Sequence, residues 1–191
     1  MFPGADHLTP NPAGASRVTL DVAVFNGAVT SGNTAGVTVS PVVPRPHEML
    51  AIALEQARAG AAQGGVPVGA ALFAADGTLL GAGHNRRVQD GDPATHGETA
   101  AFRAAGRRPD YAGTTMVTTL SPCFFCAGLI RQFRIPRLVV GEAGTFGGQH
   151  AWLAEHGVEV TVLDDPECAE LMGRFAKEHP ATWLEDIGGP E

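Results

Sequence analysis

The stretch Thr115-Met-Val-Thr-Thr-Leu-Ser-Pro-Cys-Phe-Phe-Cys-Ala-Gly-Leu-Ile-Arg-Gln-Phe133 decides the fold, because it joins a short apolar run to a longer amphipathic segment. Within residues 115–120, Met116 and Val117 are apolar at consecutive positions, which predicts a strand covered on both faces. In the Ser121-Pro122 pair that follows, serine is a typical N-cap and proline suits the first helical position. We therefore predict a helix over 122–133 that carries Cys123-x-x-Cys126 on one face of its first turn.

The segments on either side alternate between helical and strand patterns. Apolar residues at helical spacing precede the Gly64-Gly65 stop, and an Asp76-Gly77 turn separates two strand-like runs. We expect helices over 49–61, 96–105, 122–133, 149–156 and 166–178, and strands over 68–74, 78–83, 115–120, 137–141 and 158–163. This alternation predicts an α/β layered domain.

The composition limits the classes of partner. The chain has 191 residues, 44% of them apolar, and a formal net charge of −7, and its lysines and arginines form no run. The negative electrostatic field of such a protein repels the phosphate backbone of a nucleic acid. We therefore expect no long nucleic acid partner. No stretch reaches the length of apolar sequence that a membrane span requires, and the N-terminus lacks the pattern of a signal peptide. We predict a cytoplasmic protein without a membrane partner.

Residues 1–46 differ from the rest of the chain. They are rich in Pro, Gly, Ala and Thr and nearly free of charge, which predicts a flexible N-terminal extension ahead of a domain over 47–191. Alternating valines, such as those between Val18 and Val24, favour either short strands or a chance pattern in a Val/Thr-rich segment.

A second motif, Thr95-His96-Gly97-Glu98, precedes the cysteine pair. Thr95 is a typical N-cap that would place His96 in the first turn of a helix, so two helix N-termini could converge on one ion. One imidazole and two thiolates, from His96, Cys123 and Cys126, would give Zn²⁺ three protein ligands and leave a fourth position for water. Bound zinc lowers the pKa of water, and Glu98 is the natural acceptor of its proton.

Each half of this pattern also has a purely structural interpretation. Glu98 could complete a Thr95-x-x-Glu98 capping box, and a lone C-x-x-C also occurs in redox pairs and structural zinc sites. The combination of His-x-Glu with Pro-Cys-x-x-Cys, however, is the known signature of zinc-dependent deaminases and favours a catalytic zinc site. Cys168 is expected to be a small buried residue, and five histidines are left without a functional role: His47, His84, His150, His156 and His179.

From about residue 49 to 189 the chain resembles the fungal-type cytosine deaminases of the cytidine deaminase-like superfamily. Beside the two zinc motifs, the resemblance rests on Gly64-Gly-Val-Pro-Val-Gly69, Gly83-His-Asn-Arg86, Val139-Val-Gly-Glu142 and Trp183-Leu-Glu-Asp-Ile-Gly188. It implies a three-layer α/β/α fold around a central mixed sheet of about five strands. It also implies one zinc ion per chain, a homodimer, and a small-molecule nucleobase as substrate.

The resemblance further implies that cytosine is hydrolysed to uracil and ammonia, with Glu98 as proton shuttle. Asn85 and the Gly97 N–H would bind the pyrimidine edge, and Asp186 would accept from the exocyclic amine. The pocket walls would come from Leu120, Ser121, Phe146 and Trp183. Alternatives are a deaminase of guanine, 5-methylcytosine or isocytosine, and, from another class, a non-catalytic zinc-stabilised binding module. The Phe124-Phe125 pair departs from the family pattern.

Overall fold

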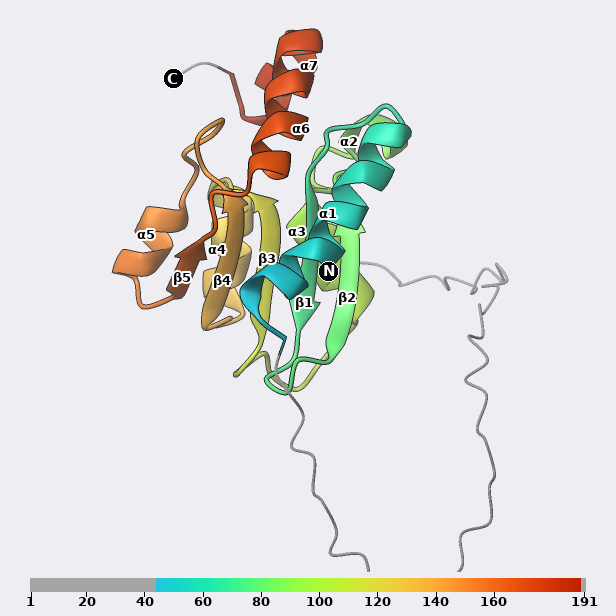
Figure 1. The fold of residues 1–191 in the computed structure, drawn as a ribbon. Coiled ribbons are helices and arrows are strands. Elements are labelled where there is room, and N and C mark those ends of the chain that lie inside the picture. Colours follow the sequence, from blue (N-terminus) through green and yellow to red (C-terminus); the bar gives the residue numbers. More distant parts are fainter. Residues whose placement is uncertain (1–43, 190–191) are drawn as a thin grey trace, which may run out of the picture. The chain divides into compact units, whose positions relative to one another are not determined.

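The computed structural model describes residues 44–189, so the predicted extension, with its possible strands between Val18 and Val24, lies almost wholly outside the described residues. The described chain forms five strands and seven helices (Figure 1). The strands are β1 (Gly69–Phe73), β2 (Leu79–His84), β3 (Thr115–Leu120), β4 (Arg137–Glu142) and β5 (Glu159–Val162). The helices are α1 (Pro46–Ala62), α2 (Arg87–Asp90), α3 (Gly97–Ala105), α4 (Phe124–Gln132), α5 (His150–Glu155), α6 (Pro166–Glu178) and α7 (Pro180–Asp186).

The strands form one mixed sheet in the order β2-β1-β3-β4-β5. β1 pairs antiparallel with both β2 and β3, whereas β3, β4 and β5 run parallel. All residues of β1 and β3 are buried, as expected of central strands with helices on both faces. The predicted α/β/α architecture with a mixed five-stranded sheet is confirmed.

Each face of the sheet has its own apolar core. Alternate residues of β1 divide between the two faces: Leu72 joins a cluster with residues of α3, α4 and α5, and Ala71 joins one with residues of α1. Cys168, from α6, belongs to the second cluster and is buried, as the sequence predicts. Gly69 allows α1 to lie directly on β1, because a Cβ there would be 2.1 Å from the Ala53 carbonyl oxygen.

The parallel strands and the helices that follow them determine where the site forms. The carboxyl end of β3 and the N-termini of α3 and α4 lie at the same end of the sheet, and α7 lies at this end too (Figure 1). In α/β sheets, ligands bind outside the carboxyl ends of the strands. Within residues 44–189, no helix is both long and apolar enough to cross a membrane.

Two short helices and several helix starts differ from the sequence-based expectation; α1, for example, begins at Pro46 and not at Met49. α2 and α7 were not predicted, since each is short and has little periodic pattern to reveal it. Helices α3 and α4 begin at Gly97 and Phe124, after the residues from which they were expected to start.

Candidate zinc site and substrate pocket

Two helix N-termini bring the predicted metal ligands together. His96 is the N-cap of α3 and Cys123 the N-cap of α4, both with extended backbone (ψ 168° and 174°). Cys126 lies in the first turn of α4 and is fully buried. The prediction that His96 and Cys123 lie within their helices was wrong by one residue, because each residue precedes its helix and turns its side chain across the gap between them.

The residues predicted to cap these helices have other partners. The Ser121 hydroxyl donates to the Gly147 carbonyl over 2.7 Å instead of capping α4. The Thr95 hydroxyl donates to Asp92 over 2.6 Å, and the Thr95 N–H bonds the Asp92 carbonyl. Thr95 and Glu98 therefore do not form the capping box that was the alternative interpretation of this motif. The Glu98 carboxylate does not serve as a helix cap.

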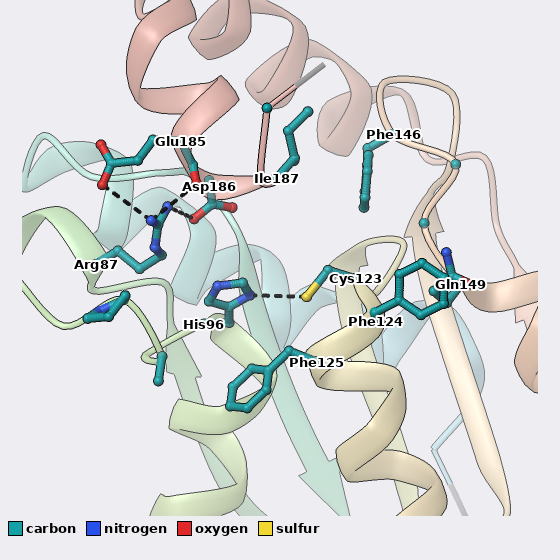
Figure 2. A pocket seen from close by; sticks show the side chains of 16 residues that line it. Arg87, His96, Cys123, Phe124, Phe125, Phe146, Gln149, Glu185, Asp186 and Ile187 are labelled. Carbon is teal, nitrogen blue, oxygen red and sulfur yellow. Dashed lines mark hydrogen bonds and ion pairs between the residues drawn. The ribbon is translucent and has the colours of Figure 1, made fainter. Parts of the chain in front are cut away.

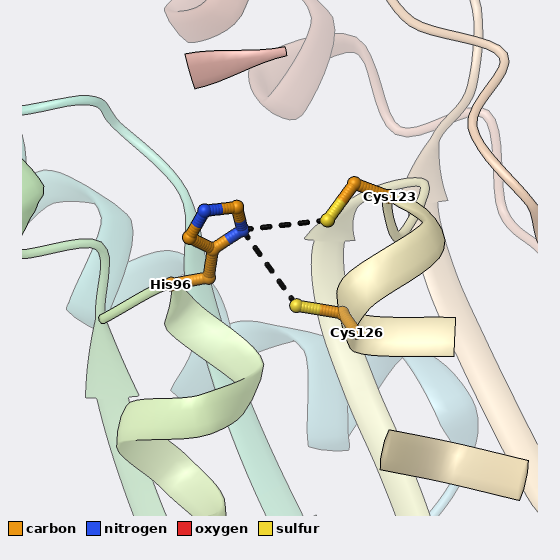
Figure 3. A group of neighbouring side chains, drawn as sticks. All are labelled: His96, Cys123 and Cys126. Atoms are coloured by element: carbon orange, nitrogen blue, oxygen red, sulfur yellow. Dashed lines mark hydrogen bonds between the residues drawn. The ribbon is translucent and has the colours of Figure 1, made fainter. Parts of the chain in front are cut away.

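The three predicted ligand atoms have the spacing that one zinc ion requires (Figure 3). His96 Nδ1 lies 3.5 Å from Cys123 Sγ and 3.7 Å from Cys126 Sγ, and all three atoms lie within 4.8 Å of one another. Tetrahedral zinc, with Zn–S of about 2.3 Å and Zn–N of about 2.0 Å, holds its N and S ligands about 3.5 Å apart. The donor set and its spacing therefore fit zinc, which His96 would bind through Nδ1 and Cys123 and Cys126 through Sγ.

Without a metal, these side chains polarise one another. Hydrogen bonds from Cys126 and His96 outweigh burial and lower the pKa of the Cys123 thiol to about 4. Burial opposes the charging of His96, but its contact with Cys123 and the nearby carboxylates raise its pKa to about 9. The bond to Cys123, together with burial, raises the pKa of Cys126. The pair Cys123–His96 thus holds a thiolate, the form that binds metal.

Glu98 lies beside these ligands with its side chain buried. Burial, and then the negative charge of Cys123, raise the pKa of its carboxyl group to about 6, while the His96 charge opposes this shift. A carboxyl group whose pKa is raised towards neutral pH, and which lies next to a metal site, is suited to accept a proton and return it.

An inner cavity of about 20 Å³ adjoins the ligands, and it shares His96, Cys123 and Asp186 with a larger open pocket of about 740 Å³ (Figure 2). Its lining includes seven of the residues predicted for the site besides the metal ligands: Asn85, Glu98, Leu120, Ser121, Phe146, Trp183 and Asp186. Val68 and Ile187 also line it and were missed. Gly97 lies buried at the start of α3 and is not part of this lining, so the role predicted for its N–H stays a prediction.

The C-terminal segment closes one side of the cavity. Asp186, at the end of α7, accepts hydrogen bonds from Asn85 Nδ2 over 2.9 Å and from Arg87 Nη1 over 2.8 Å. Trp183 packs edge-on against Phe146, with ring centroids 5.8 Å apart. Arg87 was not predicted as a site residue, and its position two residues after Asn85 is the one local signal that could have indicated it.

The loop that carries Phe146 is fixed by side chains from the strand ends. Glu142, the last residue of β4, accepts from the backbone N–H groups of Gly144 (2.7 Å) and Thr145 (2.9 Å). Ser121 Oγ holds the Gly147 carbonyl in the same loop. The glycine-rich sequence of the loop suggests mobility, but these bonds hold both of its ends against the sheet.

Comparison with known proteins agrees with this site. Residues 44–142 match the family described as the cytidine and deoxycytidylate deaminase zinc-binding region. Cytosine deaminase of Candida albicans is 45% identical over 141 residues, which cover 73% of this chain and 94% of that protein. A solved structure of tRNA:A34 deaminases is 29% identical with a TM-score of 0.57, covering 66% of this chain and 99% of that one. Another solved structure, in complex with 2,6-diaminopurine, is 27% identical with a TM-score of 0.62. The match covers 72% of this chain and 85% of that one.

The fold and the His-Cys-Cys centre with a buried glutamate define the class of zinc-dependent hydrolases that remove an amine from a nitrogenous base. The chain belongs to the cytidine and deoxycytidylate deaminase zinc-binding family. The matched zinc-binding region contains His96, Cys123 and Cys126, three side chains whose ligand atoms lie close enough together to hold one ion.

Proposed function

We propose that this protein hydrolyses the exocyclic amine of free cytosine, giving uracil and ammonia. The observation that carries the proposal is Asp186, a carboxylate that lines the same small cavity as His96, Cys123 and Glu98. A carboxylate accepts from an amine but has no donor for a carbonyl oxygen, so it favours the amino base over its product. The 45% identity with the Candida albicans cytosine deaminase supports the same substrate.

The residues on the chain divide the chemistry between them. Zinc, when bound, supplies a Lewis acid that lowers the pKa of a water molecule towards neutrality. Glu98 is placed to accept a proton from the attacking water and deliver it to ring N3, which would make C4 more open to attack. Glu98 would then move the second proton of that water to the departing amine, so that the C4–N bond breaks and ammonia leaves. Water and cytosine thus give uracil and ammonia with no other reactant.

The remaining lining residues orient and enclose the ring. Asn85 and the Gly97 N–H are proposed to bind its polar edge, while Phe146, Trp183 and Leu120 form apolar walls. The inner cavity of about 20 Å³ holds roughly one water molecule. A pyrimidine needs more room than the inner cavity alone offers, and the adjoining open pocket of about 740 Å³, which shares His96, Cys123 and Asp186 with it, provides that room.

The test is an ammonia-release screen of the purified zinc protein against cytosine, 5-methylcytosine, isocytosine, guanine, adenine and cytidine. We expect the highest kcat/KM on cytosine. Best turnover on a purine or on cytidine would contradict the substrate, and a wild-type protein that is inert on every compound would favour a zinc-stabilised binding module instead.

We also propose a homodimer and a cytoplasmic location. Three aromatic side chains on or beside α4 are unusually exposed, Phe124 by 68%, Phe125 by 54% and Phe133 by 41%, and a second copy would cover them. Three free thiols are suited to a reducing compartment. Sedimentation equilibrium tests the dimer: the wild type should sediment at twice the chain mass, and replacement of Phe124 and Phe125 by glutamate should give the monomer.

A further inference from the structure

The side chain of Arg87 is nearly buried beside the zinc site, although no sequence motif singles it out. It comes from the start of α2, and its guanidinium group contacts the end of α7 (Figure 2). Nη1 donates to Asp186 Oδ1 over 2.8 Å, and Nη2 lies 3.3 Å from both the carbonyl oxygen and Oε1 of Glu185. The Arg87 and Asp186 side chains are only 10% and 8% exposed, respectively.

The arrangement of donors around Asp186 is asymmetric. Within residues 44–189, the two side-chain donors that reach its carboxylate, Arg87 Nη1 and Asn85 Nδ2, both bond Oδ1. The second oxygen, Oδ2, is therefore the acceptor left for a ligand in the cavity. The Asn85 side chain is itself held by Arg87, since its Oδ1 accepts from the Arg87 backbone N–H over 3.1 Å. Arg87 thus contacts two polar residues of the cavity wall, Asn85 and Asp186.

The guanidinium group of Arg87 directs its hydrogen bonds at the end of α7. Nη1 bonds the Asp186 carboxylate, and Nη2 bonds the carbonyl oxygen and the carboxylate of Glu185. These bonds restrict the direction of the Asp186 carboxylate, because its rotation would break the bond to Nη1 and turn Oδ2 away from the cavity.

We propose that Arg87 is a positioning residue of the reaction: it fixes Asp186 so that Oδ2 accepts from the amine of the substrate and selects the amino base over its carbonyl product. The proposal rests on the proposed function for the identity of the substrate. Arg87 need not touch the base, because it acts through Asp186. An arginine is required for this, since its planar fork spans Asp186 and Glu185 together, whereas lysine is a single point charge.

The kinetic test is a double-mutant cycle between Arg87→Met and Asp186→Asn, with Arg86→Met as the matched control. Arg86 is the neighbouring arginine, but its ion pair is with Asp90 on the surface. We expect Arg87→Met to raise KM for cytosine at least tenfold and to weaken discrimination against uracil as an inhibitor, with kcat less affected and zinc content unchanged. Arg86→Met should stay within twofold of the wild type, and Arg87→Lys should restore only part of the loss.

In the Asp186→Asn background, Arg87→Met should change KM less than twofold, because the group that it positions is already lost. A full tenfold effect in that background, or unchanged kinetics in the single variant, would overturn the proposal. If Arg87 has only a structural role, Arg87→Met should lower the thermal midpoint and leave the ratio of the KM for cytosine to the inhibition constant of uracil unchanged. This outcome would also contradict the proposal.

A substrate-free measurement separates this proposal from the proposed function. Trp152→Phe leaves Trp183 on α7 as the single tryptophan. Arg87→Met should then increase the quenching of its fluorescence by acrylamide, and Arg86→Met should not. If the wild type prefers another base, the cycle is run with that base. If it is inert on every base, the proposed function fails, and quenching decides: an increase supports the positioning of α7 by Arg87, and no change overturns it.

Discussion

Asn85 and Asp186 lie 101 positions apart in the chain, yet Asn85 Nδ2 donates to Asp186 Oδ1 over 2.9 Å beside the zinc ligands. This bond joins the residue after β2 to the last residue of α7, so the C-terminal helix contributes directly to the polar wall of the cavity. Buried polar groups of this kind discriminate strongly between ligands. A ligand that leaves them without a hydrogen-bond partner binds more weakly by the full cost of their desolvation.

Replacement of Asp186 by asparagine should therefore reduce kcat/KM for cytosine about 100-fold or more, which corresponds to about 3 kcal/mol. The amide keeps the size of the side chain but loses the charge that accepts from the amine. Steady-state ammonia release measures the effect, with zinc content checked in parallel. Glu155→Gln is the control, since this exposed side chain at the end of α5 lies outside the lining of both cavities and should lose less than threefold. Equal losses in both variants would contradict the assigned role.

Glu98→Gln should abolish turnover while the protein keeps its zinc. Glutamine retains the shape of the buried side chain but cannot accept a proton, and a general acid–base residue contributes about 10² to 10⁴ in rate. We expect kcat to fall at least 10³-fold and zinc content, measured by mass spectrometry, to remain one ion per chain. Substantial activity in this variant would mean that another group moves the protons.

Much of this site follows from the sequence because it is local. The strand-then-helix pattern around residues 115–133 and the His96/Glu98 motif predicted three ligands and a proton carrier, and the structure brings all four together. The errors at these two motifs concern where each helix begins, by one residue for α3 and two for α4. Both His96 and Cys123 adopt extended conformations at an N-cap, and the position of a helix start is the part of a helix that sequence patterns determine least well.

What the sequence could not show are partners that are distant along the chain. Ser121 is a good N-cap by type, but its hydroxyl bonds Gly147, a partner created by the way β3 and the following loop pack. Arg87 looks like any exposed arginine in a polar loop until α7 brings Asp186 to it. The resemblance to cytosine deaminases suggested Asp186 and Trp183, whereas periodicity alone did not predict α7 at all.

Removal of the metal should expose one reactive thiol. In the zinc-free protein the pKa of Cys123 lies at about 4, below the ordinary value, so at pH 6 this thiol is mostly thiolate. Burial raises the pKa of Cys168, and bonding to Cys123 followed by burial raises that of Cys126, so both stay protonated thiols. After chelation at pH 6, iodoacetamide should therefore label Cys123 first, as read by peptide mass spectrometry, and labelling should slow as the pH falls through 4.

Zinc provides the control for this experiment. A coordinated thiolate is bound to the ion and reacts slowly, so the zinc-loaded protein should be protected at Cys123 at the same pH. Labelling of Cys168 ahead of Cys123, or equal rates with and without chelator, would contradict the arrangement of the three sulfurs.

The last prediction concerns Glu142, which controls the loop that carries Phe146. Its Oε2 accepts from two backbone N–H groups, and Oε1 is buried without a partner among the described residues. Glu142→Ala removes both acceptors and leaves two N–H groups to find water, which costs roughly 1–3 kcal/mol. We expect a lower free energy of unfolding in urea and a raised KM, since Phe146 would no longer be held against Trp183.

Glu142→Gln separates the hydrogen bonds from the charge. Its amide oxygen can replace Oε2 for Gly144 and Thr145, and its NH₂ group would occupy the place of the unpartnered Oε1. The KM of this variant should therefore stay near that of the wild type, while that of Glu142→Ala rises several-fold. If the two variants raise KM equally, the charge of Glu142 matters rather than its contacts with the loop, and the loop is held in place by Ser121 instead.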